Sequence, residues 1–237
     1  MNYFCESLWA IFIKDIVTEF RSKQVLPTMI VLGMLIVWVM RIVSESASAG
    51  NAVMGAAALW ISLLFSGLLT QERSFAVEEH ADCMSGLLLA PVEPETIYIA
   101  KLLVNIIMLC VFEIVVVPVV FLAFAVSVDG RWVEFITVLL LGNIGISSVG
   151  TLFSAVVGLA RTRGSLLSII VLVILMPMMI PATFALLQLF NAIPTEISGI
   201  GTLAFVGSFD AAMGYMVAFD AVFVVACWLL FGFIIKE

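Results

Sequence analysis

The sequence predicts an all-α polytopic membrane protein with six transmembrane helices, and composition is the first observation behind this fold class. The chain of 237 residues is 64% hydrophobic and only 11% charged, with a mean hydropathy of +1.26. A soluble domain is about 45–50% apolar and about 25% charged. The apolar excess is too large for one globular core, which excludes a soluble enzyme, a disordered chain and a nucleic-acid binder.

The second observation is that six apolar stretches are long enough to cross a bilayer. A helix needs about 20 residues to span a hydrocarbon core of about 30 Å. The predicted spans are Val25–Met40, Ala52–Thr70, Ile97–Val128, Val133–Ala160, Leu166–Phe190 and Ala211–Ile235. The first is short, so we expect it to gain a turn from its flanks.

The third observation is the placement of the basic residues, which fixes the expected orientation. Eight of the 10 lysines and arginines lie on one side of the predicted spans. They are Lys14, Arg21, Lys23, Arg73, Lys101, Arg161, Arg163 and Lys236. Only Arg41 and Arg131 lie on the other side. Because cytoplasmic loops carry the excess of basic residues, we expect both termini in the cytoplasm.

Residues 1–24 predict an amphipathic helix ahead of the first span. Apolar side chains recur at every fourth position, at Phe4, Leu8, Phe12, Ile16 and Phe20. Polar and charged residues lie between them, at Glu6, Lys14, Asp15, Thr18, Glu19 and Arg21. Such a helix anchors a chain in the membrane interface. It can also act as a connector that transmits the motion of a partner to residues 25–237, the predicted six-span domain.

Residues 71–94, between the second and third spans, form the longest predicted cytoplasmic segment. Acidic residues crowd its first half beside Arg73, at Glu72, Glu78, Glu79 and Asp82. If this segment is helical, it can lie on the membrane surface and present its charged side to a cytosolic protein. The alternative is a solvated acidic loop, although long loops often carry function.

The sequence does not indicate an enzyme or a metal site. His80 is the single histidine, whereas a zincin motif needs two histidines one turn apart. Glu78 and Glu79 are adjacent and point to different sides of a helix, so they make a poor metal site with His80. No Walker A loop or GxSxG elbow is present. We therefore expect a non-enzymatic chain that cannot hydrolyse ATP itself.

Polar residues and prolines inside the spans are further candidates. Glu113 lies in the third span, five residues before Pro118, and an ionised carboxylate at this depth is costly. It is either a pathway or partner-contact residue, or a neutral carboxyl bonded to backbone that Pro118 frees. Pro177 and Pro181 predict a kink or break in the fifth span. The fourth span carries small residues that allow close helix approach, namely Gly142, Gly145, Ser147, Ser148 and Gly150.

Several of these segments resemble the haem exporter protein B (CcmB) family. The most specific are QERSFAVEEHADCMSGLLLAPVEPETIYIAKLLVN and GTLFSAVVGLARTRGSLLSIIVLVILMPMMIP. The second segment contains Arg161 and Arg163 together with the two prolines of the fifth span. Glu113 with Pro118 adds to the likeness, which covers the chain from its first helix to its last span.

The resemblance implies a permease subunit of an ABC transporter for cytochrome c maturation in the bacterial inner membrane. It implies the ABC-2 type fold, with an N-terminal connector helix and a coupling helix within residues 71–94. The implied partners are a separate ATPase (CcmA), a haem-handling membrane subunit (CcmC), a small single-span subunit (CcmD) and a periplasmic haem chaperone (CcmE). ATP hydrolysis is then tied to haem delivery or to release of the haem-loaded chaperone.

The resemblance extends to individual residues only in part. Phe75 and Glu78 match a Phe-x-x-Asp pattern at the start of the coupling region, with Glu in place of Asp. Many ABC-2 permeases continue with Gly-Thr-Leu-Glu, whereas this chain reads Asp82-Cys83-Met84-Ser85. The expected ATPase contacts are Glu72, Arg73, Phe75, Glu78, Glu79 and Asp82. Arg161 and Arg163 belong to the second cytoplasmic loop.

The residue types argue against a haem site within this chain. Axial haem ligands are His, Met, Cys or Tyr, but His80 is on the predicted cytoplasmic side, and methionine in a bundle usually serves packing. We therefore expect no cofactor bound by this chain alone, with haem and ATP handled by partner subunits. An ABC-2 permease that exports a lipid, drug or glycan has the same fold and is the main alternative.

Overall fold

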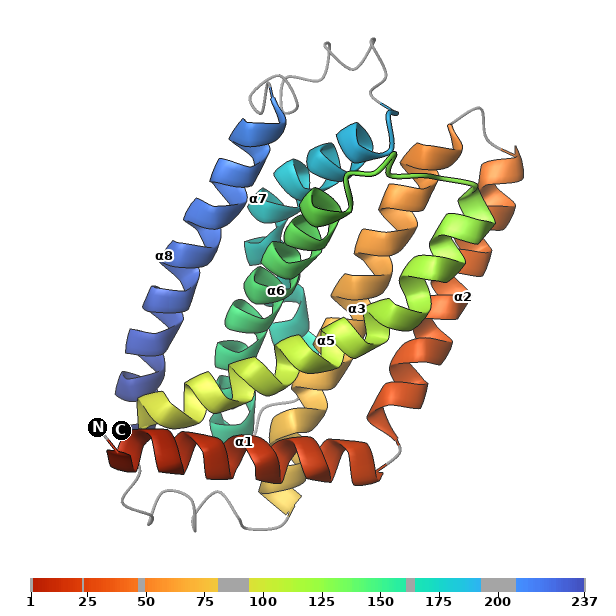
Figure 1. Cartoon of the computed structure of the whole chain (residues 1–237). Helices are drawn as coiled ribbons and strands as arrows, with labels where there is room; N and C mark the ends of the chain where they lie inside the picture. Colours follow the sequence, from red (N-terminus) through yellow and green to blue (C-terminus); the bar gives the residue numbers. More distant parts are fainter. Residues whose placement is uncertain are drawn as a thin grey trace.

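The computed structural model describes residues 2–22, 24–46, 50–80, 94–160, 165–192 and 208–236. In this part of the chain there are seven α-helices and no strand (Figure 1). The helices are α1 (Asn2–Ser22), α2 (Val25–Ser46), α3 (Asn51–His80), α5 (Pro94–Phe124), α6 (Trp132–Ala160), α7 (Ser165–Leu189) and α8 (Phe209–Lys236).

Six helices form a bundle, and α1 lies across one end of it, where both chain termini are found (Figure 1). Each of these six carries an apolar run long enough to cross a membrane. The runs are Val25–Glu45, Asn51–Gln71, Glu95–Phe124, Trp132–Val156, Ile169–Leu189 and Phe209–Phe233. They confirm the six predicted spans. The first span begins at Val25 as predicted and extends past Met40 to Glu45, so it gains its extra turn at one flank and not at both.

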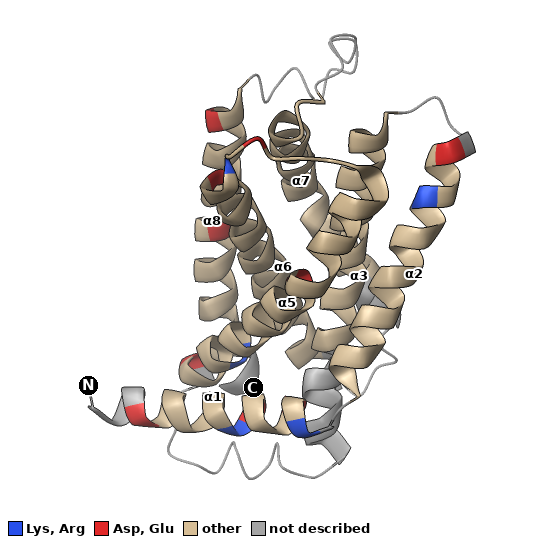
Figure 2. Cartoon of the chain, turned by 45° about the vertical axis from the view of Figure 1, so that its right-hand side comes forward, with Lys and Arg blue, Asp and Glu red and all other residues tan. Residues whose placement is uncertain are grey.

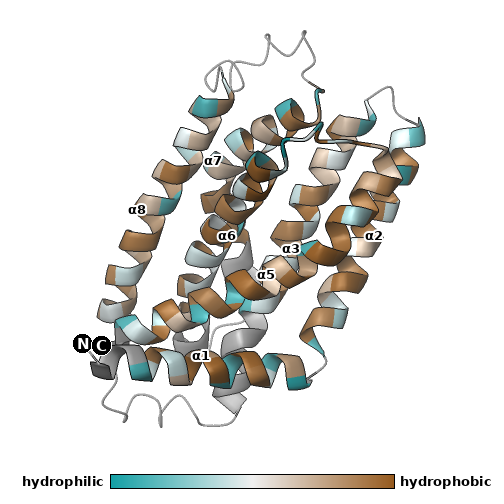
Figure 3. Cartoon of the chain, viewed as in Figure 1, coloured by the Kyte–Doolittle hydropathy of each residue, from teal (hydrophilic) through white to brown (hydrophobic). Residues whose placement is uncertain are grey.

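The surface of the bundle suits a hydrocarbon environment. Hydrophobic residues dominate the length of the six helices, whereas hydrophilic residues gather near the helix ends (Figure 3). Large apolar side chains are exposed along this surface, with Leu122 84% and Val133 79% exposed. A soluble protein rarely exposes large contiguous apolar patches. Charged residues likewise concentrate toward the two ends of the described bundle (Figure 2).

The ends of α3 and α5 are among the helix boundaries that differ from the sequence-based prediction. α3 continues to His80, so residues 71–80 extend the second-span helix instead of beginning a separate loop. α5 ends at Phe124, before the predicted end at Val128. The reason for the early end is that Ala125 has φ 52°, a left-handed conformation that an L-residue cannot propagate as a helix.

The prolines of the fifth span do not break it. Pro177 and Pro181 both lie inside α7, which runs without interruption from Ser165 to Leu189. Pro118 is similarly contained within α5. Transmembrane helices tolerate such prolines because neighbouring helices and local adjustments satisfy the freed carbonyl groups. Of the predicted kink or break, the break is therefore wrong, since the helix continues through both positions, and the kink stays a prediction.

The described residues form two separate hydrophobic cores. The larger core draws on six helices, from Val25 of α2 to Met216 of α8. The smaller core joins one residue of α1, Ile11, to the ends of α5, α6 and α8 that lie nearest the termini. Its other buried members are Ile97, Tyr98, Ala100, Leu102, Leu152, Ala155, Cys227 and Phe231.

Close packing around α6 depends on its glycines. A Cβ atom placed on Gly142 would lie 2.5 Å from the Trp60 ring of α3. A Cβ atom on Gly145 would overlap Met178 of α7 and lie 2.8 Å from Oδ1 of Asp220 on α8. The predicted small residues thus allow helices to approach α6 closely on more than one side: α3 at Gly142, and α7 and α8 at Gly145.

Gly142→Ala is expected to lower the free energy of unfolding by about 1–3 kcal/mol, because the added methyl group overpacks the rigid Trp60 ring. The measurement is SDS-induced unfolding of the purified chain in bicelles. Gly214→Ala in α8 is the matched control, since among the described residues nothing beyond its chain neighbours and its own helix backbone lies within 4 Å of its Cβ position. Equal loss in both variants would contradict the packing argument.

Candidate functional site

A row of buried polar residues runs along α6. The five residues are fully or almost fully buried and recur at spacings that keep them on adjoining helix faces. They are Asn143, Ser147, Ser148, Thr151 and Ser154. Buried polar groups inside a membrane protein are costly unless they find partners. The neighbouring helices therefore determine what this row can do.

α5 supplies several of these partners, and we call the contact the α5–α6 seam. The Asn105 side-chain amide donates to the Thr151 hydroxyl over 2.8 Å. The Tyr98 hydroxyl donates to the Ser148 carbonyl over 3.2 Å. Nearer the middle of α5, the Asn143 amide donates to the Cys110 sulfur over 3.6 Å. The seam thus extends from near the start of α5 into the centre of the bundle.

Glu113 lies in this seam and is almost fully buried. Its side chain lies near the side chain of Asn143 on α6. Among the described residues, its Oε1 and the Asn143 Oδ1 have no hydrogen-bond partner. Glu113 thus lies beside α6, and its two expected roles, as a pathway or partner-contact residue or as a neutral carboxyl bonded to backbone near Pro118, stay predictions.

Gln71, which the sequence-based analysis did not single out, also binds α6. The Gln71 amide, at the end of the second span, donates to the Ile146 carbonyl over 3.0 Å. A Cβ atom on Gly150 would overlap the same amide group. Gly150 therefore makes room for Gln71. A lone amide at the end of an apolar run was the only signal in the sequence.

The helix α1 is held against α5 by apolar contacts and by an ion pair. Nζ of Lys101 lies 3.5 Å from Oδ2 of Asp15, with the two side chains 2% and 12% exposed. Lys14 lies 3.1 Å from the other oxygen of Asp15. Because Lys101 is buried, its charge needs a counter-ion, and Asp15 provides one.

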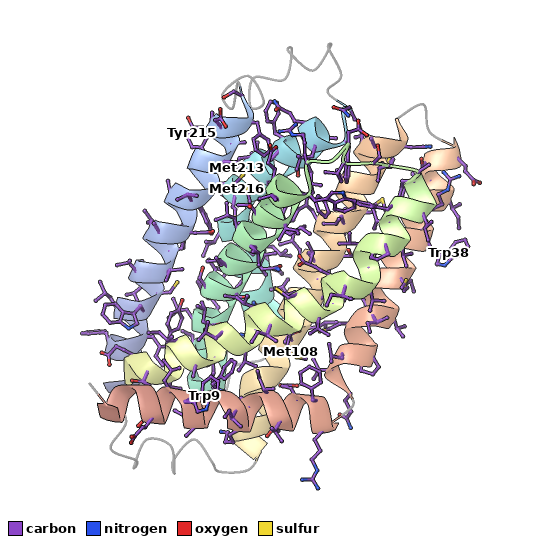
Figure 4. All side chains as sticks on the ribbon, in the orientation of Figure 1. Trp9, Trp38, Met108, Met213, Tyr215 and Met216 are labelled. Carbon is purple, nitrogen blue, oxygen red and sulfur yellow. The ribbon has the colours of Figure 1, made fainter. Side chains whose placement is uncertain are left out.

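This contact corrects the predicted two-sided pattern of α1. Asp15 was expected on a charged face, but it points toward Lys101. A second apolar row of Trp9, Ile13 and Val17 is 60%, 43% and 53% exposed (Figure 4 labels Trp9). The helix therefore has a protein-facing side, an exposed apolar side and a charged side that includes Lys14. The prediction missed this because spacing alone does not show what a helix packs against.

The sequence comparison with protein families is decisive for identity, because residues 6–227 match the family described as CcmB protein. The chain belongs to the CcmB family. CcmB proteins are transmembrane permease subunits of an ABC transporter for haem export and cytochrome c maturation. This makes the chain a multi-pass inner-membrane protein that works with other Ccm components. The search of curated proteins finds no match.

Most of the CcmB site residues predicted from the sequence lie at the end of α3 or outside the described residues. Glu72, Arg73, Phe75, Glu78 and Glu79 lie on the last turns of α3, and their side chains are outside the described residues. Asp82, Arg161 and Arg163 lie wholly outside them. In α7, Pro177 is exposed and Pro181 is buried.

The end of the CcmB bundle opposite α1 is linked by polar contacts. Arg131 forms an ion pair with Glu134 at the start of α6, and its guanidinium lies 4.9 Å from the Phe209 ring centroid of α8. The Asn191 amide, just after α7, donates to Asp129 before α6. In the described residues, no group of three His, Cys, Asp or Glu side chains could hold a metal ion.

Thr151→Val is expected to lower the free energy of unfolding by about 0.5–1.7 kcal/mol, because the Asn105 amide loses its acceptor within the membrane. Thr137→Val is the control, because the Thr137 hydroxyl donates only to the Val133 carbonyl of its own helix over 2.7 Å at an exposed site. Its change is expected below about 0.5 kcal/mol. SDS-induced unfolding measures both, and equal losses would argue against the seam.

Proposed function

We propose that this chain couples ATP hydrolysis by a separate ATPase to haem delivery or to release of the haem-loaded periplasmic chaperone. The observation that carries the proposal is the CcmB family match over residues 6–227. The arrangement of α1 across the end of a six-span bundle supports it (Figure 1), because a crossing helix at the membrane surface can receive motion from a cytosolic partner.

The proposed orientation places α1 and both termini in the cytoplasm. Lys14 and Arg21 of α1 and Lys101 of α5 lie at the end of the bundle that holds the termini. Arg41, near the end of α2, and Arg131, before α6, lie at the opposite end. The excess of basic residues in cytoplasmic segments supports this orientation. Arg131 and its linked contacts then face the periplasm.

ATPase docking is proposed for residues 71–94, together with the acidic end of α3. Closure of the ATPase dimer on ATP pushes this segment, and α1 and α7 move with it. The periplasmic ends of the helices then alter how partner subunits hold the chaperone. The helical extension of α3 to His80 supports a mechanical role, because a continuous helix links the docking segment rigidly to the second span.

Haem is proposed to bind the partner subunits and not this chain alone. Several methionines that could serve as ligands are packed in the larger core, including Met108 and Met216, labelled in Figure 4. Met29 accepts a hydrogen bond from Thr70 over 3.0 Å. These roles in packing and local bonding support the proposal that the methionines serve the structure of the bundle.

Co-purification with an ATPase, followed by measurement of ATP turnover with and without haem-loaded chaperone, tests the proposed function. We expect the chaperone to change the turnover rate. If ATP turnover does not change with the chaperone but changes with a lipid, drug or glycan, the result would instead support an ABC-2 permease that exports that substrate.

Reversing two charges with Glu78→Lys and Glu79→Lys is expected to weaken ATPase binding about tenfold or more, because opposite charges across the docking surface become like charges. The measurement is binding of the purified ATPase together with its stimulated turnover. Glu45→Lys with Glu134→Lys is the matched control, because it reverses two charges at the opposite end of the bundle. Normal coupling in the first variant would show that the docking assignment is wrong.

The chain purified without its partners is expected to hold far less than one haem per protein. Absorption in the Soret region, together with a haem-extraction assay, measures the ratio. The positive control is the same preparation made with the haem-handling subunit. Stoichiometric haem on the chain alone would refute the partner assignment.

A further inference from the structure

The helix α1 is attached to α5, although α2 follows it directly in the sequence. The smaller hydrophobic core joins Ile11 of α1 to Ile97 and Tyr98 of α5. Leu8 packs against the same core. Phe12 and Ile16 of α1 pack against the larger core. A displacement of α1 therefore acts on the beginning of α5 through the smaller core.

The Asp15–Lys101 ion pair lies within this attachment. Lys101 is 2% exposed and Asp15 is 12% exposed, so neither charge is well solvated. Removal of either partner leaves the other charge in a poorly solvated place, which disfavours the packed arrangement. Lys14, the second cation near Asp15, is 51% exposed and can remain solvated when α1 moves.

α5 is also the helix that begins where the proposed docking segment ends. Residues 71–94 lead directly to Pro94, the first residue of α5. Lys101 lies two helical turns after Pro94. Asn105, which belongs to the α5–α6 seam, lies one turn after Lys101. The crossing helix and the docking segment thus converge on the same short part of one helix.

We propose that the packed contact between α1 and α5 around Asp15 and Lys101 is the joint through which movement of α1 passes to α5 and the α5–α6 seam, and that the Asp15–Lys101 ion pair keeps this contact closed by leaving no uncompensated charge in it. Asp15 and Lys101 are positioning residues: they hold α1 to α5 and contact no substrate. This inference rests on the proposed function for the source of the movement. The attachment itself is a property of the chain alone, so it can be tested without any partner.

The first test measures hydrogen–deuterium exchange of residues 6–21 in the full chain reconstituted in nanodiscs. Asp15→Leu removes the Asp15 counter-ion from the buried Lys101, and we expect at least tenfold faster exchange in α1. Lys101→Met leaves Asp15 with Lys14, which is 51% exposed, so we expect faster exchange in α1 but a smaller increase. The double variant D15L/K101M removes both charges, so α1 is expected to exchange as slowly as in the unaltered chain. Arg41→Gln is the control, because it breaks the Arg41–Glu45 ion pair of 3.4 Å at the opposite end.

The second test measures ATP turnover in the complex with the ATPase. Both single variants are expected to keep basal turnover but to lose most of the response to the haem-loaded chaperone. The double variant is expected to recover that response. Recovery of the response in the double variant shows that the single variants lost transmission through the joint and not their overall structure. The double variant also keeps the test valid if a single variant fails to fold.

Three results would overturn the joint. The first is slow exchange in α1 together with a normal response to the chaperone in both single variants. The second is fast exchange in α1 of the double variant. The third is a double variant whose α1 exchanges slowly but whose ATP turnover does not respond to the chaperone. A chain without these substitutions that recruits no ATPase overturns the proposed function instead. The exchange experiment then still decides whether the ion pair holds α1 to α5.

Discussion

The close approach of other helices to α6 is the constraint on which this bundle depends. A bilayer offers no water to buried amides, hydroxyls and carboxyls, so these groups depend on partners in the protein. The Ser148 and Ser154 hydroxyls bond to carbonyls of α6 itself, whereas other groups bond across to neighbouring helices. Gly142, Gly145 and Gly150 bring the neighbours near enough for this by leaving room for Trp60, Met178 and Gln71. The polar seam and the packed core are consequences of one arrangement, because the small residues of α6 serve both.

Much of the fold could be predicted because the membrane simplifies the relation between sequence and structure. Apolar runs of sufficient length indicate spans almost directly, and all six were found. The boundaries were less predictable. A positive φ at Ala125 ends α5, and a polar sequence after Thr70 continues as α3. Both depend on local backbone conformation, which hydropathy does not report.

The candidate site was less accessible to sequence reasoning. Glu113 stood out because a carboxyl group is rare in an apolar span, but nothing in its flanking residues indicated that it lies near Asn143 of α6. The pairing of Asp15 with Lys101 joins residues far apart in the chain. Such contacts follow from the way α1 and α5 cross. The sequence alone therefore indicated the residue types of the site and not their partners.

The exposed apolar row on α1 has a consequence for how the protein is held in its surroundings. Trp9, Ile13 and Val17 lie on a helix whose other sides meet protein and charged residues. Tryptophan favours the boundary between hydrocarbon and water, so the lipid acts as a structural ligand of α1. Delipidation removes one of the surfaces that position this helix. The bilayer is thus part of what links α1 to the six spans.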